Sequence, residues 1–122
     1  MKNYQKKNEM FIDTHAHPFE TVDLIKKKHE NAFSFDKLID KTKDKSVTNI
    51  ICISTKLQDI DLHAHLSAKY KELAFSVGIH PMHIDELNSE NFQILEKKTK
   101  IFLENKEKIV AVGEIGIDLF HY

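Results

Sequence analysis

Short apolar runs alternate along this chain with longer stretches in which apolar residues recur every three or four positions. The short runs are rich in Ile and Val and predict strands at about 10–14, 47–53, 74–77 and 109–112. The longer stretches predict amphipathic helices after a Ser34 N-cap, at about 59–71, and at about 89–105. Apolar strands that alternate with such helices predict a parallel sheet joined by right-handed crossovers.

The connection after the first strand, Pro18–Asn31, is longer than most connections and is expected to be a loop. The helix expected at 59–71 has an apolar stripe at Leu62, Leu66 and Tyr70, spaced i, i+4, i+8. We therefore expect this stripe to face the sheet.

The same helix contains the pattern His63-Ala64-His65. On a helix, residues i and i+2 point about 200° apart, so these two rings cannot bind one ion together. We expect His65 to lean toward the sheet and His63 to be exposed.

Two other histidines, His15 and His17, close the first predicted strand. Alternate strand residues point to the same face, so both rings leave the strand end side by side, with Asp13 behind them on the same parity. Two imidazoles in this arrangement can bind one divalent ion, and a nearby carboxylate such as Asp13 can orient a ring nitrogen.

Polar residues also follow the third and fourth predicted strands. Glu114 ends the apolar run 109–112 and lies between Gly113 and Gly116, which allow a tight turn and a close backbone approach. A carboxylate at such a position can bridge two metal ions. His80 follows the third strand in a turn before Pro81. Because sites in parallel β/α folds form at the carboxyl ends of the strands, these side chains should meet at one rim.

The motifs MFIDTHAHP (10–18), GIHP (78–81) and VGEIGID (112–118) occur in this order. In residues and spacing they resemble the TatD-type metal-dependent deoxyribonucleases of the amidohydrolase superfamily. The resemblance extends over Met10–Tyr122. It implies a (β/α)8 barrel that hydrolyses phosphodiester bonds, typically in DNA with RNA as the alternative, using divalent metal ions.

The resemblance also implies a role for each matching residue. His15 and His17 would be ligands of one metal, and Glu114 would bridge two metals and act in catalysis. His80 would lie near the substrate phosphate, and Asp118 would support the site. A complete site would hold two divalent ions, and the residues do not distinguish Mg, Mn and Zn.

Length bears on how much of such a barrel is present. The chain has 122 residues, whereas a complete barrel needs about 250. The remaining ligands that the family implies, two histidines and an aspartate, would lie beyond Tyr122. We therefore interpret 10–122 as the N-terminal half of a hydrolase barrel, about four strands in a truncated chain, and 1–9 as a disordered extension.

Composition narrows the possible partners and location. Eighteen lysines balance 19 acidic residues for a net charge of −1, so no basic excess indicates a nucleic-acid partner. No apolar stretch is long enough to span a membrane, and the first nine residues lack the apolar region of a secretory signal. A lone Cys52 excludes a disulfide scaffold. We expect a cytoplasmic protein.

Three interpretations remain open on these grounds. The chain is part of a metal-dependent phosphodiesterase, or it is a catalytically inert product that keeps half a metal site. A third alternative is a relative that cleaves C–N bonds, although the GEIGID motif favours the phosphodiesterases. A half-barrel would also leave apolar surface and strand edges open, which favours self-association.

Overall fold

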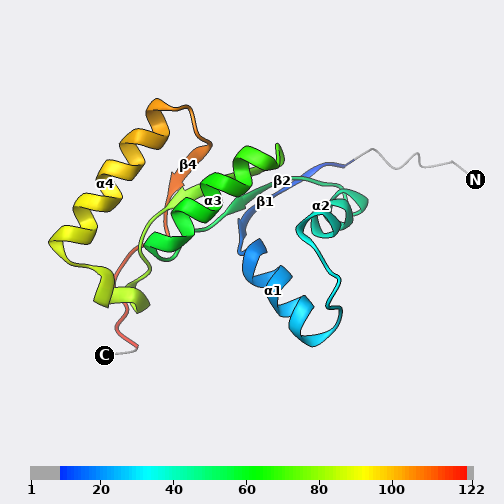
Figure 1. Ribbon diagram of the computed structural model, residues 1–122, viewed down its shortest axis with the longest axis horizontal. Helices are drawn as coiled ribbons and strands as arrows, with labels where there is room; N and C mark the ends of the chain where they lie inside the picture. The colour runs from blue at the N-terminus through cyan, green and yellow to red at the C-terminus, as the bar shows by residue number, and fades with distance from the viewer. Residues whose placement is uncertain (1–8, 121–122) are drawn as a thin grey trace, which may run out of the picture.

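The computed structural model describes residues 9–120. Within them four strands form one sheet, and the intervening helices form a second layer packed on it (Figure 1). The elements follow in the order β1 (Phe11–Ala16), α1 (Pro18–Lys28), α2 (Phe35–Asp44), β2 (Val47–Cys52), α3 (Leu57–Lys69), β3 (Leu73–Val77), the 3-10 helix η1 (Pro81–Glu86), α4 (Ser89–Glu104) and β4 (Ile109–Val112). The expected extension at 1–9 falls almost wholly outside the described residues and stays a prediction.

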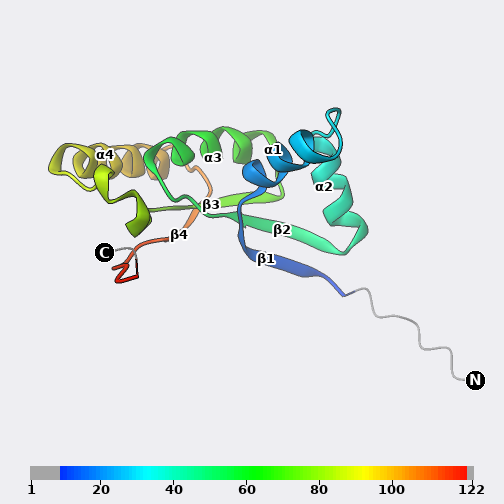
Figure 2. The same ribbon diagram turned by 90° about the horizontal axis from the view of Figure 1, so that it is seen from below.

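The sheet is parallel throughout and its strands lie in chain order, β1-β2-β3-β4. Each connection returns the chain to the same end of the sheet, which confirms the predicted β/α alternation. All of the α-helices lie on one side of the sheet (Figure 2). The carboxyl ends of the strands therefore meet along one rim, where the loops that follow them come together.

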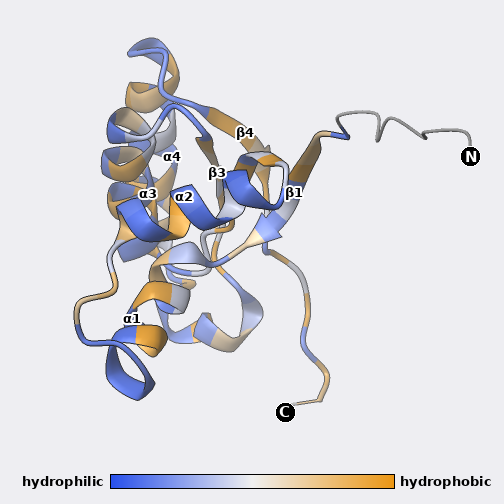
Figure 3. Cartoon of the chain, turned by 90° about the vertical axis from the view of Figure 1, so that its right-hand side faces the viewer, coloured by the Kyte–Doolittle hydropathy of each residue, from blue (hydrophilic) through white to orange (hydrophobic). Residues whose placement is uncertain are grey.

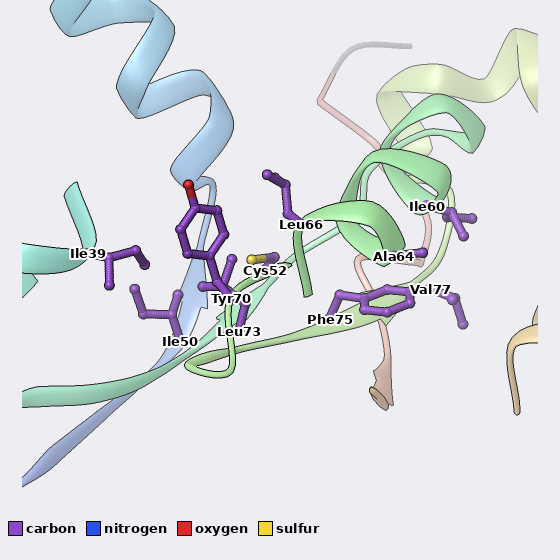
Figure 4. Close-up of a cluster of buried hydrophobic side chains, with 10 residues drawn as sticks. All are labelled: Ile39, Ile50, Cys52, Ile60, Ala64, Leu66, Tyr70, Leu73, Phe75 and Val77. Carbon is purple, nitrogen blue, oxygen red and sulfur yellow. The ribbon is translucent and has the colours of Figure 1, made fainter. Parts of the chain in front are cut away.

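The core lies between the sheet and its helices and centres on α3 (Figure 4). Its buried members are Ile39, Ile50, Cys52, Ile60, Ala64, Leu66, Tyr70, Leu73, Phe75 and Val77. Phe75 is fully buried, and its ring meets that of Phe102 from α4 edge to face, with 6.3 Å between centroids. Burial raises the pKa of the Cys52 thiol to about 12, so this residue behaves as a small apolar group.

The segment expected as a long loop is instead mainly a helix, α1, so that expectation is wrong. Pro18 occupies the first helical turn, where its fixed φ suits the helix and its missing N–H costs nothing. Glu20 lies in the first turn and the lysines 26–28 in the last, which complements the helix dipole at both ends. Val22 is the buried contact of this helix. Pro18 is its other buried residue, and two buried positions explain why no clear stripe marks this helix in the sequence.

The two histidines of α3 are placed opposite to expectation. His63 is 1% exposed, whereas His65 is exposed. The buried face of the helix follows Ile60, Ala64 and Ser67. His63 falls on that face, and its Nδ1 lies 2.9 Å from the Ser54 hydroxyl. The predicted stripe of Leu62, Leu66 and Tyr70 does pack on the core, but the buried face is wider than this stripe and includes His63.

The edge strands leave apolar side chains open to solvent. Phe11 and Ile12 of β1 and Val110 and Val112 of β4 are all more than half exposed. In Figure 3 hydrophobic colour marks β4 and the start of β1. No helix within residues 9–120 has the length and apolar character needed to cross a bilayer.

The burial of His63 predicts how stability depends on pH. Burial lowers the pKa of this imidazole below its ordinary value of 6.5. The unfolded chain then binds a proton more readily, so stability present above pH 6.5 is lost as the pH falls from there toward the folded-state pKa. Urea unfolding should be measured above and below pH 6.5. The free energy of unfolding should fall less on acidification in His63→Leu than in the wild type. His65→Leu should keep the wild-type dependence, and equal pH dependence in all three would contradict the argument.

The open strands predict self-association of the 122-residue chain. Exposed apolar side chains beside unpaired edges favour contact between copies, so light scattering after size exclusion should detect species larger than the 14.2 kDa monomer. Val110→Lys should reduce this association. The matched control is Leu103→Lys on α4, because the two residues are 56% and 55% exposed. A cooperatively folded monomer at high concentration would show that the exposed edge strands do not drive self-association.

Candidate metal centre

The first two candidate metal ligands lie at the end of β1. His15 is within the strand, and His17 follows it as the N-cap residue of α1. The strand is anchored there because Ile53 donates its N–H to the Ala16 carbonyl at 2.9 Å. The Nδ1 of His17 lies 3.2 Å from the Ile53 carbonyl oxygen, an acceptor only, so Nδ1 carries the proton in this contact. The neutral ring then presents an unprotonated Nε2, the form in which histidine binds a metal.

The third donor, Glu114, is placed by the turn after β4. Gly113 donates its N–H to the Val77 carbonyl at 2.9 Å, and Glu114 donates its N–H to the Ser54 carbonyl at 3.2 Å. Gly113 has φ +152°, a conformation that L side chains rarely adopt, and the Gly113–Glu114 peptide bond is cis. A Cβ on Gly78 would lie 2.9 Å from the Gly113 carbonyl carbon, so only glycine lets this turn close against β3.

These three residues meet at the carboxyl rim of the sheet, as their strand positions predict. One ligand atom from each of His15, His17 and Glu114 lies within 4.8 Å of the others. The Nε2 of His15 lies 2.8 Å from Oε1 of Glu114, and the two imidazole rings are edge to face with 5.3 Å between centroids. The side chains of His15 and Glu114 are 54% and 31% exposed, so the cluster is open to a ligand from solvent.

His80 joins the same cluster from the end of β3. Its Nε2 lies 3.7 Å from the second carboxylate oxygen of Glu114, Oε2. The Nδ1 of His80 accepts the N–H of Met82 at 3.0 Å, so the proton of the neutral ring is on Nε2, the nitrogen nearer Glu114. The backbone N–H of His80 donates to the Thr55 carbonyl at 2.8 Å, which ties the third loop to the second.

Each of the two aspartates expected in supporting roles accepts a backbone hydrogen bond. Asp13 Oδ1 accepts the N–H of His15 at 3.1 Å, and Asp118 Oδ1 accepts the N–H of Phe120 at 2.8 Å. Asp13 thus fixes the backbone that presents His15. Asp118 shapes the segment that follows Glu114. Orientation of a histidine ring nitrogen falls to the Ile53 carbonyl for His17, not to Asp13.

The two imidazoles and the carboxylate can supply part of the coordination shell of a divalent metal ion. Two imidazole nitrogens and one carboxylate are typical ligands of Zn²⁺ and related ions at catalytic sites, where other positions are left for water or substrate. The Ile53 carbonyl behind His17 is the kind of outer partner that metal-binding histidines have. His15, His17 and Glu114 would hold the ion, and His80 stands beside them.

Several small polar residues under the site were missed from the sequence. Asp59 is buried and accepts hydrogen bonds from the N–H and hydroxyl of Thr55, at 2.9 and 3.0 Å. Ser54 and Ser76 are both fully buried and contact the Glu114 turn. The available signal was their position: Ser54 directly follows the apolar run of β2, and Ser76 interrupts that of β3.

Solved structures share this fold. A hydrolase TatD family protein from Entamoeba histolytica superposes with a TM-score of 0.70 and 25% identity, covering 90% of this chain and 38% of that one. YjjV, a TatD homologue from Escherichia coli K12, gives a TM-score of 0.63 and 28% identity with the same coverage of both chains. The chain therefore has the fold of the N-terminal half of a TIM-type barrel.

The family follows from the sequence match. The model of the TatD-related DNases matches residues 12–122, and the chain belongs to this family. A protein of Enterocytozoon bieneusi named "Putative deoxyribonuclease TATDN1 homolog" is 34% identical over 100 residues, 72% of this chain and 35% of that protein. An uncharacterized metal-dependent hydrolase of Buchnera aphidicola is 31% identical over 109 residues, 89% of this chain and 37% of its own length. The chain thus spans little more than a third of these relatives.

Metal binding is the direct test of the cluster. His17→Ala removes a donor whose ring is already oriented, so Mn²⁺ or Co²⁺ affinity measured by titration calorimetry should fall. Loss of an outer partner alone costs about 10- to 100-fold in affinity, and loss of a ligand should cost at least that much. His65→Ala, an exposed histidine from a pattern of the same spacing, should leave affinity unchanged. Equal affinity in both variants would remove His17 from the site.

Proposed function

We propose that this chain supplies one half of the active site of a metal-dependent hydrolase that cleaves phosphodiester bonds, in DNA first of all. The observation that supports the proposal is the convergence of His15, His17 and Glu114 within 4.8 Å at the sheet rim, with His80 beside them. The family membership and the relatives named as metal-dependent hydrolases support the same reaction class.

Each residue has a distinct role in this proposal. His15 and His17 would hold a divalent ion through ring nitrogens, and Glu114 would hold it through its carboxylate, whose second oxygen could serve a second ion. When bound, such ions stabilise negative charge on phosphate oxygens and lower the pKa of a coordinated water. His80 presents the Nε2–H of its neutral ring, a donor suited to a phosphate oxygen. Asp13 holds the backbone that carries His15, and Asp118 holds the segment that follows Glu114.

The charge of the chain bears on how substrate would be held. With 18 lysines against 19 acidic residues there is no general attraction for a polyanion. Several lysines are also engaged with carboxylates, as Lys27 is with Asp23 and Lys43 with Glu72. Substrate phosphate would therefore be bound mainly at the metal centre and His80, and DNA affinity should depend on metal.

Two alternatives from other classes give different results in the same assays. An inert product that keeps half a metal site would bind metal without metal-dependent affinity for DNA. A hydrolase of C–N bonds would bind metal and act on an amide in place of a phosphodiester. If RNA is the substrate in place of DNA, the reaction class is the same and only the preferred nucleic acid differs.

We expect Mn²⁺ to increase the affinity of the 122-residue chain for a fluorescent single-stranded DNA, measured by anisotropy against an EDTA control. His15→Ala should abolish the increase and His65→Ala should not. An RNA of the same sequence, measured in parallel, shows whether the chain prefers DNA or RNA. DNA affinity that is identical with and without Mn²⁺ would contradict the phosphodiester assignment.

Turnover by this chain alone should be weak or absent with Mg²⁺ or Mn²⁺. Three donors do not complete the coordination of two ions, and an incomplete site loses both affinity and geometry. Cleavage of the same labelled DNA, followed on a denaturing gel, measures it. Robust cleavage by the purified chain that His15→Ala abolishes would contradict this expectation and would support the phosphodiesterase assignment directly.

A further inference from the structure

We propose that Ser76, braced by Ser54 and His63, is a positioning residue that fixes the direction of the Glu114 carboxylate from beneath the metal centre. The inference rests on the proposed function, because it gives this buried chain of hydrogen bonds its purpose. All three residues are buried. They act through the backbone that precedes Glu114.

Ser76 sits within β3, where its neighbour Phe75 points into the helix-covered core. Adjacent strand residues point to opposite faces, so the Ser76 side chain points away from that core. It is fully buried there. Its hydroxyl donates to the Gly113 carbonyl and accepts the N–H of Ser54 at 3.1 Å. One hydroxyl thus joins the ends of β2 and β4 across β3.

Ser76 and Ser54 hydrogen-bond to the two polar groups of a single peptide unit. The Gly113 carbonyl oxygen receives the Ser76 hydroxyl, and the Glu114 N–H of the same peptide donates to the Ser54 carbonyl at 3.2 Å. With both polar groups held, this peptide plane cannot rotate without breaking a hydrogen bond. The side chain that leaves the next Cα is then directed to the 2.8 Å contact with His15.

His63 completes the chain from the helix side. Its Nδ1 lies 2.9 Å from the Ser54 hydroxyl, while its Nε2 is buried with no hydrogen-bond partner among the described residues. A buried polar atom without a partner is destabilising, and a leucine would fill a core position without that cost. Burial also lowers the pKa of His63 and keeps it neutral, which suits a partner of a hydroxyl. The histidine is therefore explained by what it does for Ser54.

Steric fit and hydrogen bonding make separate contributions to this turn: the first sets its location and the second its orientation. Gly78 leaves room for the Gly113–Glu114 backbone to approach β3. Space alone does not fix which way the peptide faces. In Ser76→Ala the room remains, but the Gly113 carbonyl and the Ser54 N–H both lose their partner. The turn then keeps its location and loses its orientation.

The test compares Ser76→Ala with Ser67→Ala. Ser67 is also a buried serine, but its hydroxyl donates to the Ala64 carbonyl within α3 and has no link to the rim. Two quantities are measured on the whole chain: Mn²⁺ affinity by calorimetry, and hydrogen exchange of the Glu114 amide by NMR in metal-free protein. The Tyr70 amide, which donates to the Leu66 carbonyl as the C-cap of α3, reports any general loss of stability.

Ser76→Ala should lower Mn²⁺ affinity by about 10- to 100-fold, the loss typical of outer partners of metal ligands. It should also speed exchange at Glu114 more than at Tyr70. Ser67→Ala should do neither. If Ser76→Ala does not fold, Ser54→Ala, which removes only the hydroxyl bonded to His63, is judged by the same two measurements with a smaller expected effect.

The outcomes separate this inference from the proposed function. If the wild-type chain binds no Mn²⁺, the metal-dependent function fails, and exchange at Glu114 in the metal-free protein still decides the positioning role. If the serine variants match Ser67→Ala in both measurements, the positioning role is overturned while metal binding by the wild type stands.

Discussion

The site depends on one close approach, that of the Gly113–Glu114 peptide to the end of β3. The approach is possible because Gly78 has no side chain, and a Cβ there would fall within 3.1 Å of three backbone atoms of the turn. It brings Glu114 to His15 and His80, donors that come from β1 and β3 respectively. Without it, β4 would still pair with β3, but its carboxylate would leave the rim in another direction. The hydrogen bonds of Ser54 and Ser76 then act on a turn that sterics have already placed.

A single strand serves both the core and the site. Phe75 of β3 fills the space between the sheet and the helices, and the next residue, Ser76, supports the Glu114 turn. The period-two alternation of a strand makes this division possible within two residues. Stability and site geometry are therefore coupled through β3. A change that shifts this strand against α3 would disturb the donors at the rim even if it touched none of them.

The strands and the convergence of donors could be predicted from sequence because both follow from local pattern. β4 was predicted with its observed bounds, and His15, His17 and Glu114 meet because the carboxyl ends of parallel strands share one rim. Helix α1 was missed because it buries little on its apolar side, and its evidence lies in Pro18 and the charges at its ends. Ser54 and Ser76 were missed because their role arises from pairing between β2, β3 and β4, and a serine within an apolar run has no local signature of that.

The two H-x-H patterns of this chain show why spacing gains meaning only from the element that contains it. At the end of β1 the extended backbone puts His15 and His17, the residue after the strand, on one side, where an imidazole nitrogen from each lies near Glu114. In α3 the period of 3.6 separates the pair, so His63 is buried beneath Ser54 and His65 faces solvent. The predicted separation is right and the predicted sides are reversed, because the packed face extends beyond Leu62 and Leu66 to Ile60, Ala64 and Ser67 and so takes in His63. Three of these four histidines nevertheless lie near the same turn: His15 and His17 beside the Glu114 carboxylate, and His63 through the buried hydroxyl of Ser54.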